Sequence, residues 1–412
     1  MKKLLALALA LCMLLSITAV AVADEKTVIT VTWWGDTDSS KAELLMIEKF
    51  NAEHDDIEIR ADIVPGDGYG DRLLTSFSSG EGYDIFASGE GDFYKWVGAN
   101  MPLSLNDLIA NDPDWNNEMN EAIYNFGNIN GDQYYLVRDY NPLALFYNKD
   151  VFDRYNVAYP TADWTWDDAI AAAKELTVAA DNTFGFNAQS WEYAALTYFA
   201  SKGLDIVNED CTAVEGYLDS PEFAAALAEY VGFSTGDDRI SPDAADQDTF
   251  GGTSAMFINN KLAMTISGAW DKATFENAGV NYGTEVVPGN HDSYLCASAF
   301  AISKNCKNPE AAWEVIKALT GTECSELRFE YTAALPTVDS LLDAMRADYG
   351  EANLGILASL NHAIQPVGLR GAIGNPAVTA FRNAFERVQF NDGTVEQILA
   401  DAVAEVAEAI AE

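Results

Sequence analysis

Basic residues are scarce in this chain of 412 residues. Lysine and arginine total 24 against 64 aspartates and glutamates, which gives a formal net charge of −40. Because nucleic acids and anionic membrane surfaces are bound by clusters of basic side chains, this balance argues against both as partners. It does not indicate disorder, since 49% of the residues are hydrophobic and 11% are aromatic, which is enough to form folded cores.

Histidine and cysteine are also few. The chain has 3 histidines and 5 cysteines, and no two cysteines stand in CxxC spacing. We therefore expect no structural zinc site and assign no metal ligands. In an exported protein the cysteines beyond the N-terminal segment could form disulfides or remain buried thiols, and the sequence leaves both open. These four are Cys211, Cys296, Cys306 and Cys324.

The usual catalytic motifs are absent. The chain contains no HExxH, GxSxG or P-loop pattern. The glycines of residues 66–70 have the wrong spacing for a dinucleotide-binding turn and predict a turn between a strand and a helix. Two carboxylates could serve glycoside hydrolysis, but 64 acids make chance pairs abundant. We expect no catalysis and no cofactor.

Long apolar runs are missing after the N-terminal segment, which itself has one. Lys2 and Lys3 precede about 20 mostly apolar residues, and Ala21–Ala23 fits the small-x-small cleavage rule. We expect residues 1–23 to be a signal peptide that is cleaved after Ala23, so that the protein is exported. An uncleaved anchor is the alternative, because the run is long enough to span a bilayer.

A lipid anchor is the third possibility for this segment. Cys12 is preceded by the bulky Leu11, where lipoprotein signals usually carry a small residue, so we do not expect lipid attachment there. Cleavage after Ala23 leaves 389 residues with a net charge near −42. That length suggests two domains of ordinary size.

The first part of the mature chain alternates strand and helix patterns. Apolar and β-branched runs predict strands, and polar residues with an apolar stripe predict the helices between them. The expected strands are 28–34, 57–63 and 83–87, and the expected helices begin after Ser39 or Ser40 and span 69–79. This order predicts an α/β fold in which a mostly parallel sheet is covered by helices.

Later helices are marked by capping residues. Thr165 followed by Asp168 is a capping-box pattern, and Ser220 and Asn308 each precede a proline at the expected first helical position. Residues 400–411 predict a terminal helix. No internal repeat or low-complexity linker separates two domains, which suggests that ordered segments connect them.

Aromatic rings stand beside acids or small polar residues at several points, some of which follow expected strands. In open α/β sheets, ligands bind at the carboxyl ends of the strands. A flat ring can cover the C–H face of a sugar, while carboxylates accept hydrogen bonds from its hydroxyls. The candidate ligand-binding residues from these segments are Trp34, Asp36, Ser88, Glu90, Asp92, Asp139, Trp191, Glu192 and Trp270.

Six segments together resemble a known family. They are Leu143–Val151, Val157–Pro160, Thr165–Thr177, Ala255–Asp271, Asn281–Pro288 and Ala301–Leu319. In this order and spacing, behind an export signal, the chain resembles the family 1 extracellular solute-binding proteins of ABC importers, the group that includes maltose-binding protein. The resemblance covers essentially the whole mature chain.

The resemblance implies a two-lobed periplasmic-binding-protein fold of type II-like organisation. Its interleaved lobes would be joined by hinge segments and would close on a solute held between them. The implied division is 24–143 with 285–336 for lobe I, and 144–284 with 337–412 for lobe II. The implied ligand is a mono- or oligosaccharide, the implied partners are the permease subunits of an ABC transporter, and the protein is expected to be a monomer.

The resemblance also gives roles to particular residues. Trp270 matches a position where the family often stacks an aromatic ring on the ligand, and Asp139 precedes the first hinge, where the family often places a polar contact. Asp36, Ser88, Glu90 and Asp92 would line the cleft edge of lobe I, and Trp191 and Glu192 would come from lobe II. Arg370 is a further candidate, although a lone arginine among acids is often only an ion-pair partner.

Three alternatives stay open at this stage. They are a receptor of the same fold for a non-sugar solute, a secreted glycoside hydrolase that uses two carboxylates, and a surface adhesin or chemoreceptor partner. The small number of basic candidates disfavours a strongly anionic ligand. The hydrolase hypothesis depends only on acids that lie near aromatic residues.

Overall fold

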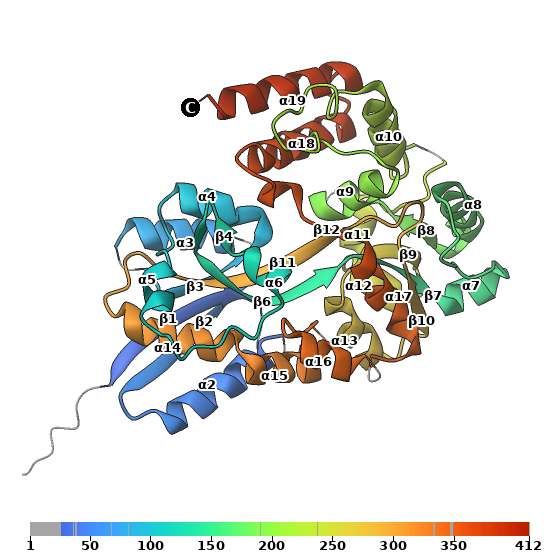
Figure 1. The fold of residues 1–412 in the computed structure, drawn as a ribbon. Coiled ribbons are helices and arrows are strands. Elements are labelled where there is room, and N and C mark those ends of the chain that lie inside the picture. The colour runs from blue at the N-terminus through green and yellow to red at the C-terminus, as the bar shows by residue number, and fades with distance from the viewer. Residues whose placement is uncertain are drawn as a thin grey trace, which may run out of the picture.

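The computed structural model describes most of residues 26–411 as two α/β lobes (Figure 1). Single residues and one pair inside that range lie outside the description: Asp36, Asp38, Asp67, Glu81, Ser190, Asp237, Ala333, Ala347 and Asp348. The expected signal peptide at 1–23, with its cleavage after Ala23 and with Cys12, also lies outside the described residues, as does the candidate ligand residue Asp36.

Lobe I is built on a six-stranded sheet in the order β12-β11-β3-β1-β2, with β6 pairing with β11. Its strands are β1 (Thr27–Trp34), β2 (Ile57–Val64), β3 (Ile85–Gly89), β6 (Tyr135–Pro142), β11 (Ser293–Ile302) and β12 (Ala363–Ile364). Its helices are α2 (Lys41–Glu53), α3 (Tyr69–Ser78), α4 (Phe93–Gly98), α5 (Asn106–Ala110), α6 (Glu121–Asn125), α14 (Pro309–Thr320) and α15 (Thr322–Thr332), with a small β4 (Asn128–Ile129) and β5 (Asp132–Gln133) hairpin. A single 3-10 turn, η1 (Glu90–Asp92), follows β3 directly.

Lobe II is built on a four-stranded sheet in the order β10-β7-β9-β8. Its strands are β7 (Ala144–Asn148), β8 (Phe184–Asn187), β9 (Leu262–Ser267) and β10 (Tyr282–Glu285). The helices on this side are α7 (Lys149–Tyr155), α8 (Trp166–Leu176), α9 (Glu192–Ser201), α10 (Pro221–Gly232), α11 (Ala244–Phe250), α12 (Thr253–Ile258), α13 (Trp270–Asn277), α16 (Asp339–Met345), α17 (Leu354–Ser359), α18 (Gly374–Gln389) and α19 (Val395–Ala409). Short 3-10 turns are η2 (Ala179–Asp181), η3 (Glu351–Asn353), η4 (Leu360–His362) and η5 (Val367–Leu369).

The α/β class is as predicted, but both sheets are mixed rather than mostly parallel. In lobe I, β1 runs parallel to β2 and β3, whereas β11 runs antiparallel to β3 and β6. In lobe II only β8 and β9 are parallel. The antiparallel pairs arise where the chain crosses from one lobe to the other. β7, β10 and β11 each lie directly before or after such a crossing, and no helical crossover connects them to their antiparallel neighbours.

The chain passes between the lobes in short segments. β6 of the first sheet leads into β7 of the second through Leu143 alone, and β10 of the second leads into β11 of the first through residues 286–292. Figure 1 shows β6 and β11 side by side, and because they are antiparallel, β6 runs toward lobe II and β11 runs back into lobe I. Later, β12 pairs with the start of β11 before the chain continues into α18.

The predicted N-terminal strands and helices are present with small shifts. β1 is buried at Ile29 and Val31, and it pairs with β2 from Thr27 opposite Ile57 to Trp34 opposite Val64. α2 buries Ala42, Glu43, Met46, Ile47 and Phe50, whereas its two leucines, Leu44 and Leu45, are only partly buried. β3 begins two residues later than predicted and ends at Gly89.

Some of the predicted helix caps are present in the structure. Thr165 and Asp168 form the expected capping box at α8, and Ser220 accepts a hydrogen bond from the backbone of Phe223 at α10. Ser40 stands at the start of α2 without capping it, because its hydroxyl accepts a hydrogen bond of 2.8 Å from the indole of Trp33.

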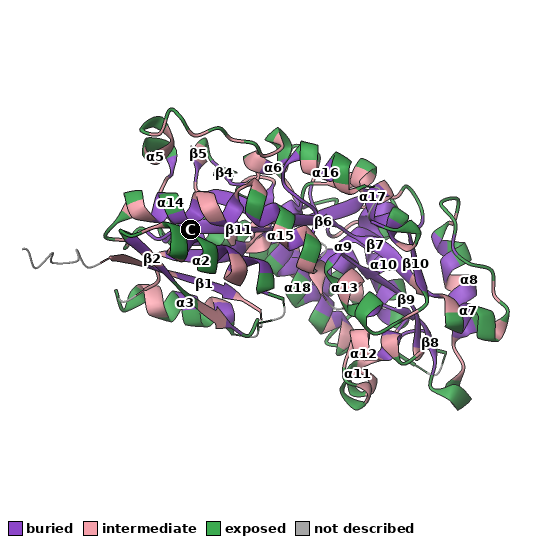
Figure 2. Cartoon of the chain, turned by 90° about the horizontal axis from the view of Figure 1, so that it is seen from below, coloured by how far each residue is buried: buried purple, intermediate pink, exposed green. Residues whose placement is uncertain are grey.

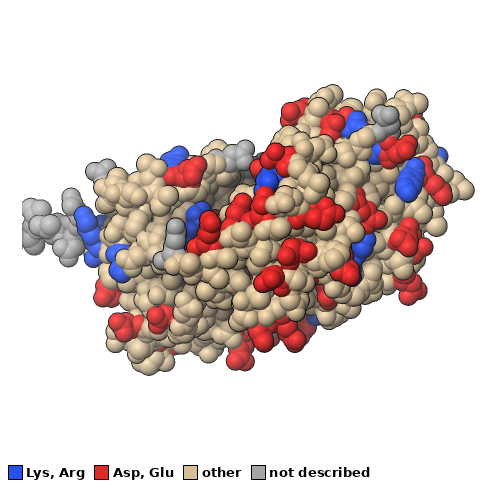
Figure 3. Space-filling view, turned by 90° about the horizontal axis from the view of Figure 1, so that it is seen from above, with Lys and Arg blue, Asp and Glu red and all other residues tan. Residues whose placement is uncertain are grey.

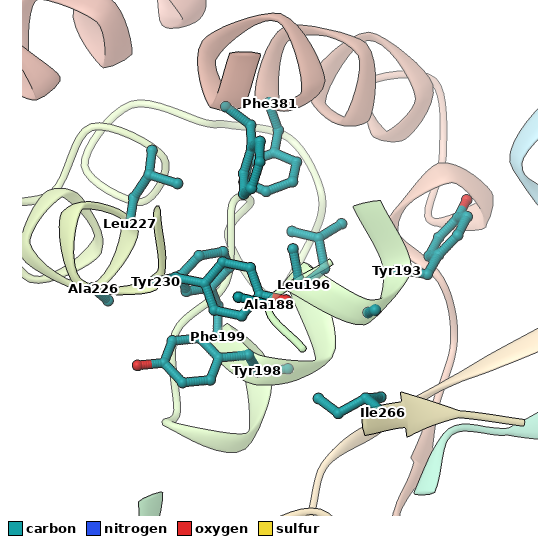
Figure 4. Packing of buried hydrophobic residues seen from close by; sticks show 14 of the residues in the cluster. Ala188, Tyr193, Leu196, Tyr198, Phe199, Ala226, Leu227, Tyr230, Ile266 and Phe381 are labelled. Carbon is teal, nitrogen blue, oxygen red and sulfur yellow. The ribbon is translucent and has the colours of Figure 1, made fainter. Parts of the chain in front are cut away.

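Buried residues fill the sheets of both lobes and the helix faces that pack on them (Figure 2). In lobe II, α9 is buried on every side from Tyr193 to Ser201. Figure 4 shows its Tyr198 and Phe199 near Tyr230 of α10 and Phe381 of α18. This packing fixes α9, and Trp191, the residue directly before the helix, contributes to the site described next.

Among the described residues, no helix combines the length and the apolar character that a membrane crossing requires. Figure 3 shows acidic side chains over much of one face, with isolated lysines and arginines between them. On that face the net negative charge is therefore carried on the exterior, where water and salt screen it.

Candidate ligand-binding site

A cleft of about 780 Å³ is lined by residues from both lobes. Lobe I contributes the ends of β1 and β3, the second half of β6, and residues of α2, β11 and α15. Lobe II contributes the segment before α9 and residues along the whole length of α13. β1 and β3 are parallel neighbours, so Trp34 and Gly89 meet at the same edge of the sheet. The volume is within the range of about 300–1,000 Å³ that small-molecule sites occupy.

The lobe I wall contains a buried network of four charges. Glu43 Oε1 lies 2.8 Å from Arg328 Nε and 3.1 Å from Arg138 Nη1. Arg138 Nε lies 3.1 Å from Asp139 Oδ2 and donates a 2.8 Å hydrogen bond to Ser298 Oγ. Arg328 also donates to the carbonyls of Arg138 and Leu319. Two guanidinium groups therefore balance two carboxylates, and both are engaged by groups of the protein.

Burial and charge act in opposite directions on these carboxyl groups. Burial alone would raise the pKa of Glu43, but Arg328 and Arg138 bring it below its usual value, so Glu43 is held ionised. For Asp139, burial dominates and raises the pKa, although Arg138 and Arg328 oppose it. Glu43 Oε2 is buried and forms no hydrogen bond with the described residues.

Glu90 is a buried acid that forms no ion pair with any basic residue in the described part of the chain. It stands in η1, just after β3, and its Oε2 accepts a 2.9 Å hydrogen bond from the backbone N–H of Ala297. Burial raises its pKa to about 7, and the charges of Glu192 and Asp139 act in the same direction. Glu90 can therefore be a hydrogen-bond donor as well as an acceptor near neutral pH.

Trp34 contributes an aromatic ring to the lobe I wall, as does Tyr331 of α15. The Trp34 ring packs edge-on against Tyr69, with 5.5 Å between ring centroids, and the guanidinium carbon of Arg138 lies 5.5 Å from its centroid. The neighbouring Trp33 also borders the cleft, but its side chain is almost fully buried and its indole is held by Ser40.

Two tryptophans form the lobe II wall. Trp191 and Trp270 meet edge to face, with 5.9 Å between ring centroids and 74° between ring planes. A Cβ at position 268 would lie 2.3 Å from the Trp270 ring, so Gly268 lets that ring lie directly on the backbone. Trp270 is nevertheless 40% exposed, which is unusual for so large a ring and leaves apolar surface facing the cleft.

Five of the sequence-predicted residues line the cleft together: Trp34, Glu90, Asp139, Trp191 and Trp270. Four others do not line it. Ser88 is buried inside β3 opposite Ala299, and Asp92 faces Lys95 at 3.2 Å. Glu192 pairs with Arg382 at 2.6 Å, and Arg370 pairs with Asp205 at 2.5 Å. The side chains of Asp92, Glu192 and Arg370 are therefore each held by a nearby residue of opposite charge.

The sequence did not point to several residues that border the cleft. Glu43, Arg138 and Arg328 come from three distant parts of the chain, and Glu43 and Arg328 are 285 residues apart. Nothing local marks them, since each reads as an ordinary surface charge. The signal that was available is the position of Arg138 directly before Asp139 at the end of β6.

Cys211, Cys296, Cys306 and Cys324 are free thiols, so of the two states left open by the sequence the structure has the unpaired one. Cys296 borders the cleft, where burial raises the pKa of its thiol well above the usual value, so the group is a neutral thiol. Within the part of the chain that the structure describes, no group of three or more histidine, cysteine or acidic side chains is arranged to hold a metal ion.

The family model of bacterial extracellular solute-binding proteins matches residues 34–323, and the chain belongs to this family. An ABC substrate-binding protein from Listeria monocytogenes, solved in complex with cycloalternan, superposes with a TM-score of 0.82 at 26% identity over 94% of this chain and 100% of that one. A solute-binding protein from Thermotoga lettingae bound to α-D-tagatose gives a TM-score of 0.79 at 20% identity over 93% and 100% of the two chains. The predicted family and two-lobed fold are confirmed.

The sequence relatives match a smaller share of this chain than the solved structures do. A putative binding protein of Brucella abortus is 25% identical over 280 residues, which is 66% of each chain, so the match spans slightly less than two thirds of that relative. A galactooligosaccharide-binding protein of Bacillus subtilis is 35% identical over 92 residues, about a fifth of each chain.

Proposed function

We propose that this protein is an extracytoplasmic receptor that captures a carbohydrate in the cleft between its lobes and delivers it to the permease subunits of an ABC transporter. The observation that carries the proposal is that the two walls of the cleft differ in chemistry. A partly exposed tryptophan face on lobe II stands across from acids and an ion-pair network on lobe I. A sugar ring has an apolar C–H face and a rim of hydroxyls, so each wall matches one part of it.

The charge arrangement favours an uncharged ligand. Arg138 and Arg328 are already engaged with carboxylates and carbonyl groups, and Glu90 forms no ion pair with a described basic residue. An anionic solute would meet Glu90 and Asp139 without a cation to balance it, whereas a neutral polyol can hydrogen bond to them. The solved relatives also support a carbohydrate, because the Listeria protein was solved with cycloalternan and the Thermotoga protein with α-D-tagatose.

Ligand capture works by closure of the lobes. The segments at Leu143 and at 286–292 are short enough to act as hinges, and a solute that touches both walls favours the closed form because it binds that form more tightly. The proposed division is residues 24–143 with 285–336 for lobe I and 144–284 with 337–412 for lobe II. The strand pairing supports most of it, since β1, β2, β3, β6 and β11 share one sheet while β7 to β10 share the other. The exception is β12, which lies within 337–412 but pairs with β11 of lobe I.

The protein performs no chemistry on its ligand in this proposal, and it acts as an exported monomer after cleavage at Ala23. Membership of an extracellular solute-binding family supports export and binding. Trp34, Glu90, Asp139, Trp191 and Trp270 are the proposed ligand contacts. Incubation with oligosaccharides should release no shorter product, and permease genes are expected beside this gene.

The decisive experiment is a thermal-shift screen of the mature protein, residues 24–412. A panel of neutral mono- and oligosaccharides is compared with sugar phosphates, dicarboxylates, amino acids and short peptides. A ligand at a hundred times its Kd stabilises the native state by about 2.7 kcal/mol, which a melting curve resolves easily. We expect a shift with at least one neutral sugar, and small-angle scattering should show a smaller radius of gyration with that sugar. A shift with a charged solute class and none with any sugar would overturn the carbohydrate assignment.

A further inference from the structure

A smaller compartment opens beside the cleft on the lobe II side. Its volume is about 340 Å³, and Trp191 and Trp270 line both the compartment and the cleft, so the two spaces meet at these rings. The rest of its wall is polar and comes from the end of β9, the starts of α12 and α13, and the loop after β8. These polar residues are Gln189, Thr253, Ser254, Thr265, Ser267 and Asp271.

Hydrogen bonds inside the wall decide what it offers to a ligand. Ser267 Oγ donates to Asp271 Oδ2 at 2.5 Å, and Ser254 Oγ donates to Asp271 Oδ1 at 3.4 Å. Because these serine hydrogens point to the carboxylate, the serine oxygens and the remaining lone pairs of Asp271 are left as acceptors. Thr253 Oγ1 accepts a 3.1 Å bond from Asn187 Nδ2, so its own hydrogen is available to donate.

The wall therefore suits a group with several hydroxyls. Acceptors dominate, one hydroxyl donor is present, and none of the lining residues is a lysine, arginine or histidine that could balance an anion. Burial raises the pKa of Asp271, although the hydrogen bonds from Ser267 and Ser254 act to lower it. The tryptophan rings at the entrance add an apolar face of the kind that covers sugar C–H groups.

Trp270 is held in a position that serves both spaces. Its six-membered ring lies against Gly268 and its neighbour Trp191 meets it edge to face, so the ring is positioned by the protein before any ligand arrives. A sugar ring that lies on Trp270 in the cleft is thus next to the entrance of the compartment. A linked second ring can enter without rearrangement of either tryptophan.

We propose that the compartment is a binding site for a second, neutral sugar ring, so that this receptor selects disaccharides or longer oligosaccharides over monosaccharides. One ring lies on Trp270 in the cleft, and the next hydrogen bonds to Ser254, Ser267 and Asp271. The inference rests on the proposed function, that the cleft takes a carbohydrate, and adds the length of the ligand.

The first test compares matched pairs by isothermal titration of the mature protein. The pairs are glucose with maltose, mannose with β-1,4-mannobiose, and galactose with β-1,4-galactobiose. In the series that binds, we expect the disaccharide to bind at least tenfold more tightly than its monosaccharide. Equal affinities within that series would overturn the second site while leaving the carbohydrate receptor intact. Failure of all six sugars and of their trisaccharides would instead count against the proposed function itself.

The second test fills the compartment. Ser254→Phe puts a ring into the space beside Asp271, and it should lower the affinity for the disaccharide at least tenfold while leaving the monosaccharide affinity within twofold. Thr249→Phe, on the exposed face of the neighbouring α11, is the matched control and should change neither. Circular dichroism and melting curves check that both variants are folded.

A third measurement tests the neutral character of the second ring. The β-1,4-linked dimer of glucosamine carries ammonium groups that Asp271 could pair with. The glucosamine dimer should bind the parent protein no more tightly than the best neutral disaccharide does. The parent protein, with Asp271 in place, should already bind that neutral disaccharide. Preferred binding of the glucosamine dimer, lost in Asp271→Asn, would show that the compartment selects a cation. Equal disaccharide affinity in Ser254→Phe and in the parent protein would overturn the site altogether.

Discussion

The lobe I wall of the cleft holds its polar side chains in a buried ion-pair network, whereas the lobe II wall presents two tryptophan rings and a set of hydroxyls. Glu43 and Arg328 are 3% and 2% exposed, and Trp270 is 40% exposed. The lobe I side chains are fixed by one another and by backbone carbonyls. On the lobe II side Trp270 keeps much of its surface without a protein partner.

This difference indicates that the two walls contribute to ligand binding in different ways. A buried charge network is costly to rearrange, so lobe I offers the ligand a fixed pattern of acceptors and donors. The exposed ring of Trp270 gains contact area only when something covers it, so we expect lobe II to supply most of the affinity when the cleft closes. Lobe I variants should therefore act first on stability, and lobe II variants on binding.

Removal of Arg328 should have the largest effect on stability. Arg328→Met leaves Glu43 as a buried carboxylate with only Arg138 to balance it, and loss of one partner of a buried ion pair costs about 3–5 kcal/mol. Urea unfolding measures this directly. Arg60→Met is the control, because Arg60 pairs with Glu58 on the surface, and its unfolding midpoint should hardly move. A loss below about 1 kcal/mol for Arg328→Met would mean that the network is not a structural element of lobe I.

The second prediction concerns pH and lobe I. Burial raises the pKa of Glu90 from its ordinary 4.5 to about 7, so between these values the native state binds more protons than the unfolded chain. Stability should therefore fall as the pH rises through that window, and the group is ionised at a cost above it. Glu90→Gln removes that cost and should be more stable than the parent at pH 8, by up to about 3 kcal/mol.

The measurement for Glu90 is the difference in unfolding free energy between Glu90→Gln and the parent at pH 5 and at pH 8. The difference should grow with pH. Glu408→Gln, an exposed acid on α19, controls for the loss of one negative charge and should give a difference that is nearly independent of pH. A constant difference for Glu90→Gln would contradict the raised pKa.

Trp270→Ala tests the lobe II wall. Loss of this ring should weaken ligand binding by about 1–3 kcal/mol, because a partly exposed aromatic face is buried only when ligand covers it. Its melting temperature without ligand should remain close to that of the parent. Phe390→Ala is the matched control, since Phe390 is 79% exposed at the end of α18 and does not line the cleft, and it should bind normally. Unchanged affinity in Trp270→Ala would remove the residue from the site.

The smallest predicted effect lies where the two lobes touch behind the cleft. The Tyr193 hydroxyl is buried and forms no hydrogen bond with the described residues, and a Cβ on Gly91 of lobe I would lie 2.9 Å from it. Tyr193→Phe should be neutral or stabilising by about 1 kcal/mol, because it removes an unsatisfied buried group. Gly91→Ala should destabilise the parent protein, because its Cβ would meet the Tyr193 hydroxyl. The same substitution should not destabilise the Tyr193→Phe variant, which lacks that hydroxyl. Equal effects in both backgrounds, measured by urea unfolding, would show that this contact does not couple the lobes.

Sequence patterns predicted many elements because their signals are local. The apolar run of β1, the capping box of α8 and the Ser-Pro start of α10 each lie within a few residues. Trp34, Trp191 and Trp270 were found in the same way, since an aromatic ring beside a strand end or helix start is visible in a short window. The family segments extended this local information to the whole fold.

The four described candidates that do not line the cleft have something in common. Ser88 was expected at the end of a strand, but β3 runs two residues further and pairs Ser88 with Ala299 of β11, more than 200 residues later. Asp92, Glu192 and Arg370 were assigned to the ligand, but each lies by an opposite charge that the sequence pattern could not identify. Where a side chain points is decided by its partner, and most of these partners are distant.

The sequence by itself determined the α/β class, the family and the aromatic and acidic residues from which a site could be made, because composition, capping and hydrophobic periodicity are properties of short segments. Only the tertiary structure decided that Glu43 of α2 is buried between Arg138 and Arg328, that Trp191 and Trp270 form one wall, and that a polar compartment opens behind them. These features depend on contacts between segments up to 285 residues apart, and such contacts form only when the chain has folded and brought those segments together.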